Sequence, residues 1–327
     1  MGGIGLVELL ALLTLGFLCR PAEAADLDIR QVGTVSEFTA DGRLVLRYHQ
    51  PPEAAKPFID PLLTPAGHSV TTARSAQLHH HGLWFTWGGL MLATTGETVS
   101  FWQEGGDPAS TGEVVMRPGS RGHAWRGKGS VALTTEYEWR RKSDGLVLLT
   151  ERREIGLLDS GSNRANLVTI TSEQTAARDL VISHQSNERV AYYGLALQMP
   201  SDMNYGLVVN SQGGEGRAGV EGLGAPWCAH ATNVSPARGV AIFDHPDNPR
   251  YPNAWFTLDN AFLSTSLVAL EDYPLKAGET LRLRYGVLAF DGDLDAKLIR
   301  QQYSRWLRYS SPATVTGRAS SSPSSGG

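Results

Sequence analysis

Histidine and tryptophan gather in one short stretch of the chain, Leu78 to Gly89, which reads Leu-His-His-His-Gly-Leu-Trp-Phe-Thr-Trp-Gly-Gly. Three of the nine histidines and two of the eight tryptophans fall within these twelve residues. Histidine takes up or releases a proton near neutral pH, and its neutral ring is a common metal ligand. Aromatic rings beside polar groups suit a sugar, which has an apolar C–H face and a rim of hydroxyls. Proton transfer and sugar binding are therefore the first chemistry to expect here.

Three consecutive histidines open this stretch. On an extended chain His79 and His81 would share one face, while His80 would point to the other. We expect His79 and His80 to be catalytic acid–base groups and His81 to contact the ligand, because Gly82 lets the backbone come close to it. A strand that buries its tryptophans and merely ends in histidines would explain the same residues without any chemistry.

A metal site is a further use of histidines. Consecutive histidines do not match the i, i+4 pair of a helical zinc site, and no cysteine pair or carboxylate lies at ligand spacing. A metal would need distant residues such as His123, His184 or His245. We therefore expect no metal and no other cofactor.

Aromatic residues and one glutamate near the histidines fit a sugar-binding cleft. Trp84 and Trp87 follow within one strand's length, and we expect them to wall the cleft together with Trp102. Glu104 follows Trp102 by two residues and stands beside two glycines, where a ligand can approach closely. We expect Glu104 to be a catalytic carboxylate; a surface carboxylate at a strand end is the plainer interpretation.

Two polar segments farther along the chain supply more candidates. His184 lies in a polar run that leaves a strand, as an acid–base group or as an exposed turn residue. The segment from Asp244 to Pro252 has three prolines that fix its backbone. We expect it to present His245, Asn248 and Arg250 to the same cleft as the histidines, because an arginine beside an amide can hold sugar hydroxyls. A rigid solvated loop without a ligand is the alternative.

Composition excludes some kinds of partner. The chain has 327 residues, of which 41% are hydrophobic, and a formal net charge of −4 with a pI near 6.1. Such a length supports a large core. The absence of a basic run argues against nucleic acid, and no apolar run after the N-terminus is long enough to cross a bilayer. The expected ligand is a small molecule or an oligosaccharide, and the oligomeric state is left open.

Both ends of the chain differ from the rest. The apolar run from Leu9 to Cys19, followed by Ala22-Glu23-Ala24, predicts a signal peptide over residues 1–24 and a periplasmic or secreted protein. An uncleaved anchor is the alternative, since no lysine or arginine precedes the run. The serine-, proline- and glycine-rich tail over residues 310–327 has little to bury, so we expect it to be disordered.

Between these ends the pattern is one of short strands and turns. Val131 to Trp139 alternates apolar and polar residues, and after Ser143-Asp144-Gly145 the run from Leu146 to Ile155 completes an antiparallel hairpin. Asp293 can cap a helix that begins after it. Further strands are expected at residues 44–49, 100–104, 167–171, 181–186, 240–244, 255–258, 262–270 and 281–289, and prolines exclude regular structure from Pro51 to the histidines. We predict an all-β fold, a large antiparallel β-sandwich with one C-terminal helix, as a single domain over residues 25–309.

Several segments in order carry a family resemblance that covers about Leu44 to Asp293. They are Pro61–Gly67, His79–Gly88, Phe101-Trp102, Tyr193–Met199, Trp227-Cys228, Phe243–Arg250 and Lys276–Tyr285 running into Asp291-Gly292. In these segments the chain resembles the PmoA-like family of bacterial proteins, largely a domain of unknown function. It departs from that family at Tyr193-Gly194-Leu195, where two glycines are more usual, and at Gln198, where arginine is frequent.

This resemblance implies a galactose-mutarotase-like supersandwich, in which a histidine and a glutamate act as acid and base on a sugar. It also implies that His81 matters less than its two neighbours, because family members vary there. The family name evokes a methane-oxidising membrane enzyme, but that activity needs several membrane-spanning helices. The leading hypothesis is a carbohydrate-active epimerase, mutarotase or lyase that uses histidine acid–base chemistry. A non-catalytic carbohydrate-binding protein is the alternative, and a metal-dependent oxidoreductase is the third.

Overall fold

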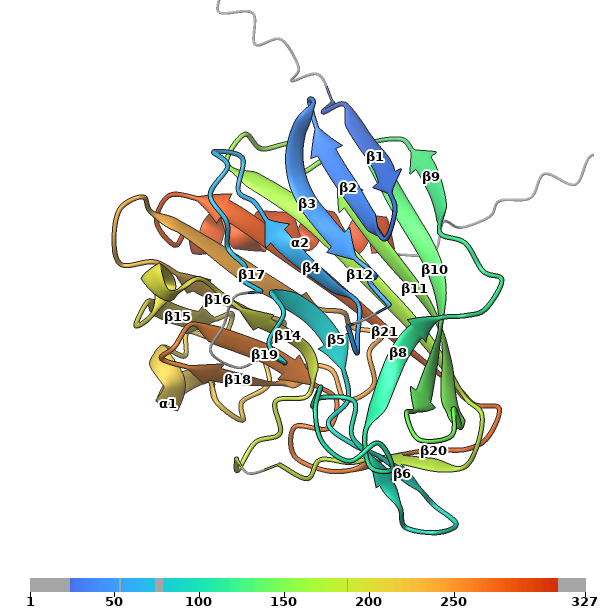
Figure 1. Ribbon diagram of the computed structural model, residues 1–327. Helices are drawn as coiled ribbons and strands as arrows, with labels where there is room; N and C mark the ends of the chain where they lie inside the picture. The colour runs from blue at the N-terminus through green and yellow to red at the C-terminus, as the bar shows by residue number, and fades with distance from the viewer. Residues whose placement is uncertain (1–23, 53, 74–78, 187, 311–327) are drawn as a thin grey trace, which may run out of the picture.

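Two large antiparallel sheets pack face to face, and a smaller sheet lies at one end of them, in the computed structural model of the chain (Figure 1). The structure describes residues 24–52, 54–73, 79–186 and 188–310. Every pair of named strands is antiparallel, which confirms the predicted all-β sandwich.

The first sheet has eight strands. In spatial order they are β1 (Leu27–Val32), β2 (Val35–Ala40), β3 (Arg43–His49), β4 (Phe58–Leu62), β5 (Leu83–Thr86), β14 (Gly194–Gln198), β19 (Phe262–Ser266) and β18 (Ala254–Leu258). Chain segments far apart in sequence thus meet at β5 and β14, and this junction carries the candidate site.

The second sheet has nine strands and the third has four. The second runs β15 (Leu207–Asn210), β16 (Trp227–Ala231), β17 (Arg238–Asp244), β21 (Thr280–Asp291), β12 (Ala165–Ala176), β11 (Val147–Leu158), β10 (Ser130–Arg141) and β8 (Gly112–Met116), and β9 (His123–Gly127) also pairs with β10. The third runs β20 (Tyr273–Leu275), β13 (Leu180–Ile182), β6 (Leu90–Leu92) and β7 (Thr98–Val99). The helical elements are the 3₁₀ helix η1 (Ser201–Met203), α1 (Gly216–Val220) and α2 (Ala296–Ser310).

The main core fills the space between the two large sheets. Phe38 and Leu46 of the first sheet and Leu133 and Tyr285 of the second are all fully buried in it. Strand β10 shows why: its odd-numbered residues from 131 to 139 are buried, while Glu136 on the other face is exposed. The alternation predicted for this strand, and the hairpin that it forms with β11, are confirmed.

A second apolar cluster lies under α2, on the outer face of the nine-stranded sheet (Figure 1). Trp306 packs over Gly286, where an added Cβ would come 2.9 Å from the indole. The C-terminal helix is therefore confirmed, but its cap differs from the prediction. Asp295, two residues after Asp293, accepts hydrogen bonds from the backbone N–H groups of Lys297 (2.9 Å) and Leu298 (3.1 Å).

Two strand predictions are wrong. The prolines after Pro51 do not exclude a strand, since β4 contains Pro61 at the point where its register with β3 shifts. The expected strand at residues 100–104 is instead an irregular segment. Of these described residues, only Ser100 makes a bridge, to Thr111, and its carbonyl oxygen accepts from the Gly112 N–H at 2.8 Å. The next two carbonyl oxygens accept from side chains, that of Phe101 from Thr86 (3.0 Å) and that of Trp102 from Lys56 (2.9 Å).

The predictions for the two ends of the chain lie almost wholly outside the described residues. They are the signal peptide over residues 1–24 and the disordered tail over residues 310–327, and both stay predictions. Within the described part of the chain, no helix has the length and apolar character that crossing a bilayer requires.

Candidate functional site

The three histidines lie just before β5, on the face of the eight-stranded sheet that points away from the main core. Trp84 of β5, Phe262 of β19 and Phe256 of β18 project to this face and form a separate aromatic cluster. The histidines pack on that cluster together with a lysine and a glutamate. We call His79, His80, His81, Lys56 and Glu104 the histidine site.

His80 is held in one tautomer by its partner. Its Nδ1 lies 3.0 Å from Oε1 of Gln198, whose amide nitrogen donates to the carbonyl oxygen of Asn260 at 2.9 Å. Because the Gln198 amide nitrogen is thus the donor end, Oε1 is the acceptor and Nδ1 of His80 carries the proton. In the neutral ring, Nε2 is then the unprotonated nitrogen.

Burial keeps two of the histidines neutral at pH 7. It lowers the pKa of His80 to about 4, and the neighbouring His79 adds to the effect. The pKa of His79 is also lowered, first by burial and then by the positive charge of Lys56. The two rings meet edge to face with centroids 4.5 Å apart. Both imidazoles are therefore uncharged at neutral pH, and His80 is 6% exposed.

Glu104 lies between Lys56 and His81, and its predicted catalytic role stays a prediction. Its Oε1 lies 2.8 Å from Nζ of Lys56 and 2.7 Å from Nε2 of His81. Burial raises the pKa of Glu104, but the hydrogen bond from His81 and the charge of Lys56 outweigh this and bring it to about 2. An ionised carboxylate has no proton to donate at neutral pH, so Glu104 is not a general acid; in the structure it orients His81 and balances the charge of Lys56.

His81 is fixed on two sides. Besides its hydrogen bond to Glu104, its ring stacks on Phe58 with centroids 4.9 Å apart, and Phe58 stacks on His49 at 4.8 Å.

Lys56, only 1% exposed, also donates to the Trp102 carbonyl oxygen at 2.9 Å. Its pKa is lowered by burial and raised in part by Glu104. Lys56 carried no sequence signal, since its partners stand more than forty residues away.

Aromatic rings enclose the site. The indoles of Trp84 and Trp102 lie 5.3 Å apart and are almost fully buried, and their N–H groups have no hydrogen-bond partner among the described residues. Tyr192 and Tyr193 each lie 5.2 Å from Trp102 and are partly exposed. The sequence interpretation missed these two tyrosines, although consecutive aromatic residues before Gly194 were a usable signal.

We predicted that Trp87 would wall this site, but the structure places it elsewhere. Trp84 and Trp87 are three residues apart, and an odd separation along an extended chain puts two side chains on opposite faces. Trp87 therefore points into the main core, where its Nε1 donates to Oε1 of Gln174 at 2.8 Å.

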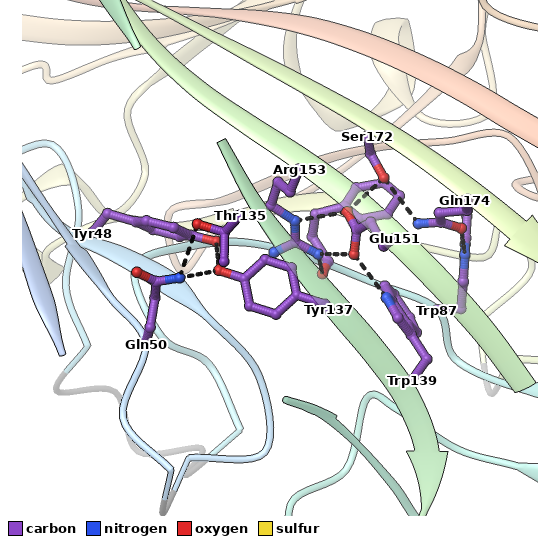
Figure 2. Close-up of polar contacts among 11 residues, drawn as sticks. Tyr48, Gln50, Trp87, Thr135, Tyr137, Trp139, Glu151, Arg153, Ser172 and Gln174 are labelled. Atoms are coloured by element: carbon purple, nitrogen blue, oxygen red, sulfur yellow. Dashed lines mark hydrogen bonds and ion pairs between the residues drawn. The ribbon is translucent and has the colours of Figure 1, made fainter. Parts of the chain in front are cut away.

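Trp87 belongs instead to a polar network buried between the two large sheets (Figure 2). At its centre, Glu151 accepts two hydrogen bonds from Arg153 (both 2.8 Å), one from the Trp139 indole (2.7 Å) and one from Ser172 (2.6 Å). We call Glu151, Arg153 and the side chains linked to them, directly or through one another, the core network. Its other members are Trp139, Ser172, Gln174, Trp87, Tyr137, Tyr48 and Gln50.

The remaining candidates do not join the histidine site. His184 is exposed and its Nδ1 lies 2.6 Å from Asp272. Arg250 donates to three backbone oxygens, those of Leu267, Glu271 and Asp272. Arg250 and His184 thus meet at Asp272, where the arginine stabilises a loop.

His245 and Asn248 also lie elsewhere. His245 packs against Trp306 of α2 with centroids 5.3 Å apart, and Asn248 is buried between Asp244 (2.6 Å) and the Arg284 carbonyl oxygen (2.8 Å). No contact joins them to the histidine site within the residues that the structure describes. The predicted shared cleft therefore does not form, because β17 carries this loop to the other side of the sandwich.

No metal-binding constellation is evident in the described chain. No group of three or more histidine, cysteine, aspartate or glutamate residues is placed to hold a metal ion there. Cys228 is buried and unpaired, and burial raises its pKa above the usual range of a thiol. It is a core residue.

A family model described as "Family of unknown function (DUF6807)" matches residues 36–304. This match overturns the resemblance to the PmoA-like family, which was wrong. The glycine and aromatic segments that suggested it lie within a chain region that another family describes. No curated protein matches the chain.

Several solved structures are similar in part. One is a GH36 alpha-galactosidase from Geobacillus stearothermophilus in complex with raffinose, with 9% identity and a TM-score of 0.44 over 85% of this chain and 42% of that one. Another is the heparan sulfate lyase HepC from Pedobacter heparinus, with 12% identity and a TM-score of 0.31 over 80% and 31% of the two chains. The chain thus spans less than half the length of these proteins, and likeness of this extent assigns no activity.

Proposed function

The chain belongs to DUF6807, a family of unknown function, and from the histidine site we propose that it is a carbohydrate-active protein that binds a sugar and moves a proton on it. The observation that carries this proposal is the state of His80. Its ring is neutral, with a pKa of about 4, and the bond to Gln198 places the proton on Nδ1.

A base of this kind can begin several sugar reactions. Nε2 of His80 takes a proton from a hydroxyl or from an activated C–H group, and the imidazolium so formed gives this proton to another atom of the sugar. His79 stands against His80 and supplies the neighbouring ring. Epimerases, mutarotases and lyases all use such a transfer, and they are the reaction classes that we propose.

The surroundings suit a sugar as the ligand. Tyr192 and Tyr193 present partly exposed rings beside Trp102, where an apolar sugar face can pack. Burial, reinforced by Tyr193, raises the pKa of Tyr192 to about 12, so its hydroxyl stays protonated and can donate to a sugar oxygen. Glu104 stays ionised and keeps His81 in place.

The test compares two histidine variants in a sugar assay. In His80→Gln the side chain remains neutral and polar but loses the basic ring, so we expect turnover to fall by about 10²- to 10⁴-fold while sugar binding changes little. NMR of mono- and oligosaccharides measures anomeric exchange, epimerisation or new unsaturated products. His184→Gln is the matched control, because His184 lies away from the site.

His79 and His81 complete the series. We expect His79→Ala to abolish sugar binding or turnover, and His81 variants to reduce them less. If His80→Gln and His79→Ala both act at the wild-type rate on a sugar that the protein converts, the histidines are structural and the proposal is wrong.

A non-catalytic carbohydrate-binding protein is the second candidate, and one observation favours it. A histidine with a pKa of about 4 is a weak base, and Glu104, with a pKa of about 2, cannot serve as its acid at neutral pH. Binding of a sugar without any conversion, lost in His79→Ala, would support this candidate over the enzyme.

We also propose that the protein is exported to the periplasm or secreted. The apolar run from Leu9 to Cys19 and the Ala22-Glu23-Ala24 site support this. Mass spectrometry of the mature protein is expected to find Ala25 at its N-terminus.

A further inference from the structure

A pocket of about 260 Å³ lies on the outer face of the nine-stranded sheet, beside the part that α2 covers. The histidine site lies on the outer face of the other sheet, so the whole main core separates the two places. Nothing in the histidine chemistry involves this pocket.

The register of four strands builds the floor of the pocket. Trp125 of β9 pairs with Ala132 of β10, Ala132 with Gly156 of β11, and Gly156 with Thr169 of β12. The other three residues of this row, Ala132, Gly156 and Thr169, have small side chains, so the row forms a low floor on the sheet. An added Cβ at Gly156 would come 2.7 Å from the Thr169 methyl group, so the low floor depends on the glycine.

Two exposed aromatic residues wall the pocket. Trp125 is 44% exposed and Tyr309, in the last turn of α2, is 38% exposed. The Tyr309 hydroxyl lies 2.8 Å from the Gly129 carbonyl oxygen, which anchors the ring at the rim. An indole and a phenol that stand out of a polar sheet face offer apolar surface to a ring-shaped ligand.

Polar groups of both kinds line the next row of the sheet. Glu154 and Thr171 face each other across β11 and β12, and Thr171 is followed by Arg284 of β21. Among the described residues, the Glu154 carboxylate has only long hydrogen bonds of 3.4 Å, from Trp125 and from Thr134. Arg282 also lines the pocket, and half of its side chain is exposed. Carboxylate, hydroxyl and guanidinium groups therefore line one pocket, and the carboxylate of Glu154 contacts the indole.

We propose that this pocket is a second sugar-binding site, which takes one uncharged hexose ring of a saccharide. Its volume is just below the roughly 300–1,000 Å³ of sites that enclose drug-sized ligands. The apolar face of the ring packs on Trp125, and its hydroxyls donate to Glu154 and accept from Arg282. Arg282 and Arg284 are already paired, with Glu173 (3.1 Å) and Asp247 (2.9 Å) respectively. Glu154, by contrast, has no ion pair among the described residues. The uncompensated charge of the pocket is therefore negative, which disfavours an acidic sugar.

The test follows the indole N–H resonance of Trp125 by NMR during titration with glucose, galactose and mannose and their disaccharides. We expect this resonance to shift with at least one neutral sugar, and Trp125→Ala to weaken the binding by about tenfold or more. Trp125→Phe identifies the resonance and keeps part of the aromatic surface. Tyr205→Ala is the matched control, because Tyr205 is 74% exposed and lies outside the pocket.

A second comparison separates this site from the histidine site. We expect His80→Gln to leave the Trp125 shift unchanged, and Glu154→Gln to weaken it. An unmoved Trp125 resonance with every sugar, or equal binding by wild type and Trp125→Ala, would overturn the second site whatever happens at the histidines. A response to glucuronate stronger than to glucose would overturn the uncharged ligand.

Discussion

The histidine site and the core network each hold a basic side chain against a glutamate, yet they are built in opposite ways. Glu151 and Arg153 stand two residues apart on one strand, β11, and are at most 2% exposed (Figure 2). Lys56 and Glu104 come from irregular segments 48 residues apart, and the Glu104 side chain is 20% exposed.

The two regions also differ in how fully their polar atoms are paired. In the core network the Glu151 carboxylate accepts four hydrogen bonds, and the indole N–H groups of Trp139 and Trp87 both have acceptors. At the histidine site the N–H groups of Trp84 and Trp102 have none among the described residues. A buried network whose polar atoms are all paired favours one packing of the two sheets, whereas unpaired N–H groups in a partly exposed site can donate to a ligand.

The largest expected effect would come from breaking the core network. Arg153→Met leaves the Glu151 charge buried without its partner, so we expect it to lower the free energy of unfolding by about 3–5 kcal/mol. Urea denaturation measures the loss. The control is Arg117→Met, which breaks the exposed pair with Glu136 and should cost less than about 1 kcal/mol.

Adding Glu151→Gln to Arg153→Met should restore part of the stability, because no unpaired charge then stays buried. A double variant less stable than Arg153→Met alone would show that the pair's charges are not what the core network depends on.

The pH dependence of stability sharpens the comparison at the histidine site. Below pH 6.5 the unfolded chain takes up a proton on residue 80, whereas folded His80 does so only near its pKa of about 4. The contribution of neutral His80 to the free energy of unfolding is therefore fully present above pH 6.5. This contribution, about 3 kcal/mol, is lost as the pH falls from 6.5 to 4. Asp244, with a pKa raised by burial to about 6, acts in the opposite direction between pH 3.8 and 6.

The difference between wild type and His80→Gln isolates this contribution, since Asp244 is common to both proteins. Unfolding free energies measured from pH 4 to 8 should show the wild type losing more stability than the variant as the pH falls. Parallel curves for the two proteins would mean that His80 titrates normally and that the site does not keep it neutral.

The smallest expected effect concerns the two tryptophans at β5, which point to opposite faces of the sheet. Trp87→Phe strands the Gln174 oxygen in the core, so we expect it to cost about 1–3 kcal/mol of stability and to leave sugar binding unchanged. Trp84→Phe removes an indole N–H without a partner among the described residues and should cost less than Trp87→Phe. It should, however, weaken sugar binding. Thermal unfolding and a sugar titration of both variants measure the contrast, and the reverse ranking would contradict it.

The sequence predicted the fold better than the site. Period-two alternation marked β10, its hairpin with β11, and β21, because strands that bury one face repeat their apolar residues every second position. It failed for β4, where a register shift accommodates Pro61, and for residues 100–104, where the carbonyl oxygens of Phe101 and Trp102 bond to side chains. Neither compensation is visible in a linear pattern.

Residue types alone were enough to single out the histidines and the tryptophans around them. The alternation of a strand could also have corrected the expectation for Trp87, since its odd separation from Trp84 excludes a common face. The sequence could not supply Lys56, Gln198 or the tyrosine pair as neighbours of the histidines, because the distances along the chain carry no information about which strands pair.

What the sequence determined by itself is a β-sandwich with a helix after its last strand and a cluster of ionisable and aromatic residues before one strand. Only the tertiary structure decided the chemistry of that cluster. The pairing of β5 with β14 brings Gln198 to His80 and sets its tautomer. The approach of Lys56 to Glu104 keeps that carboxylate ionised, with a pKa of about 2. Protonation states depend on burial and on the nearest charges, and both are properties of the folded chain.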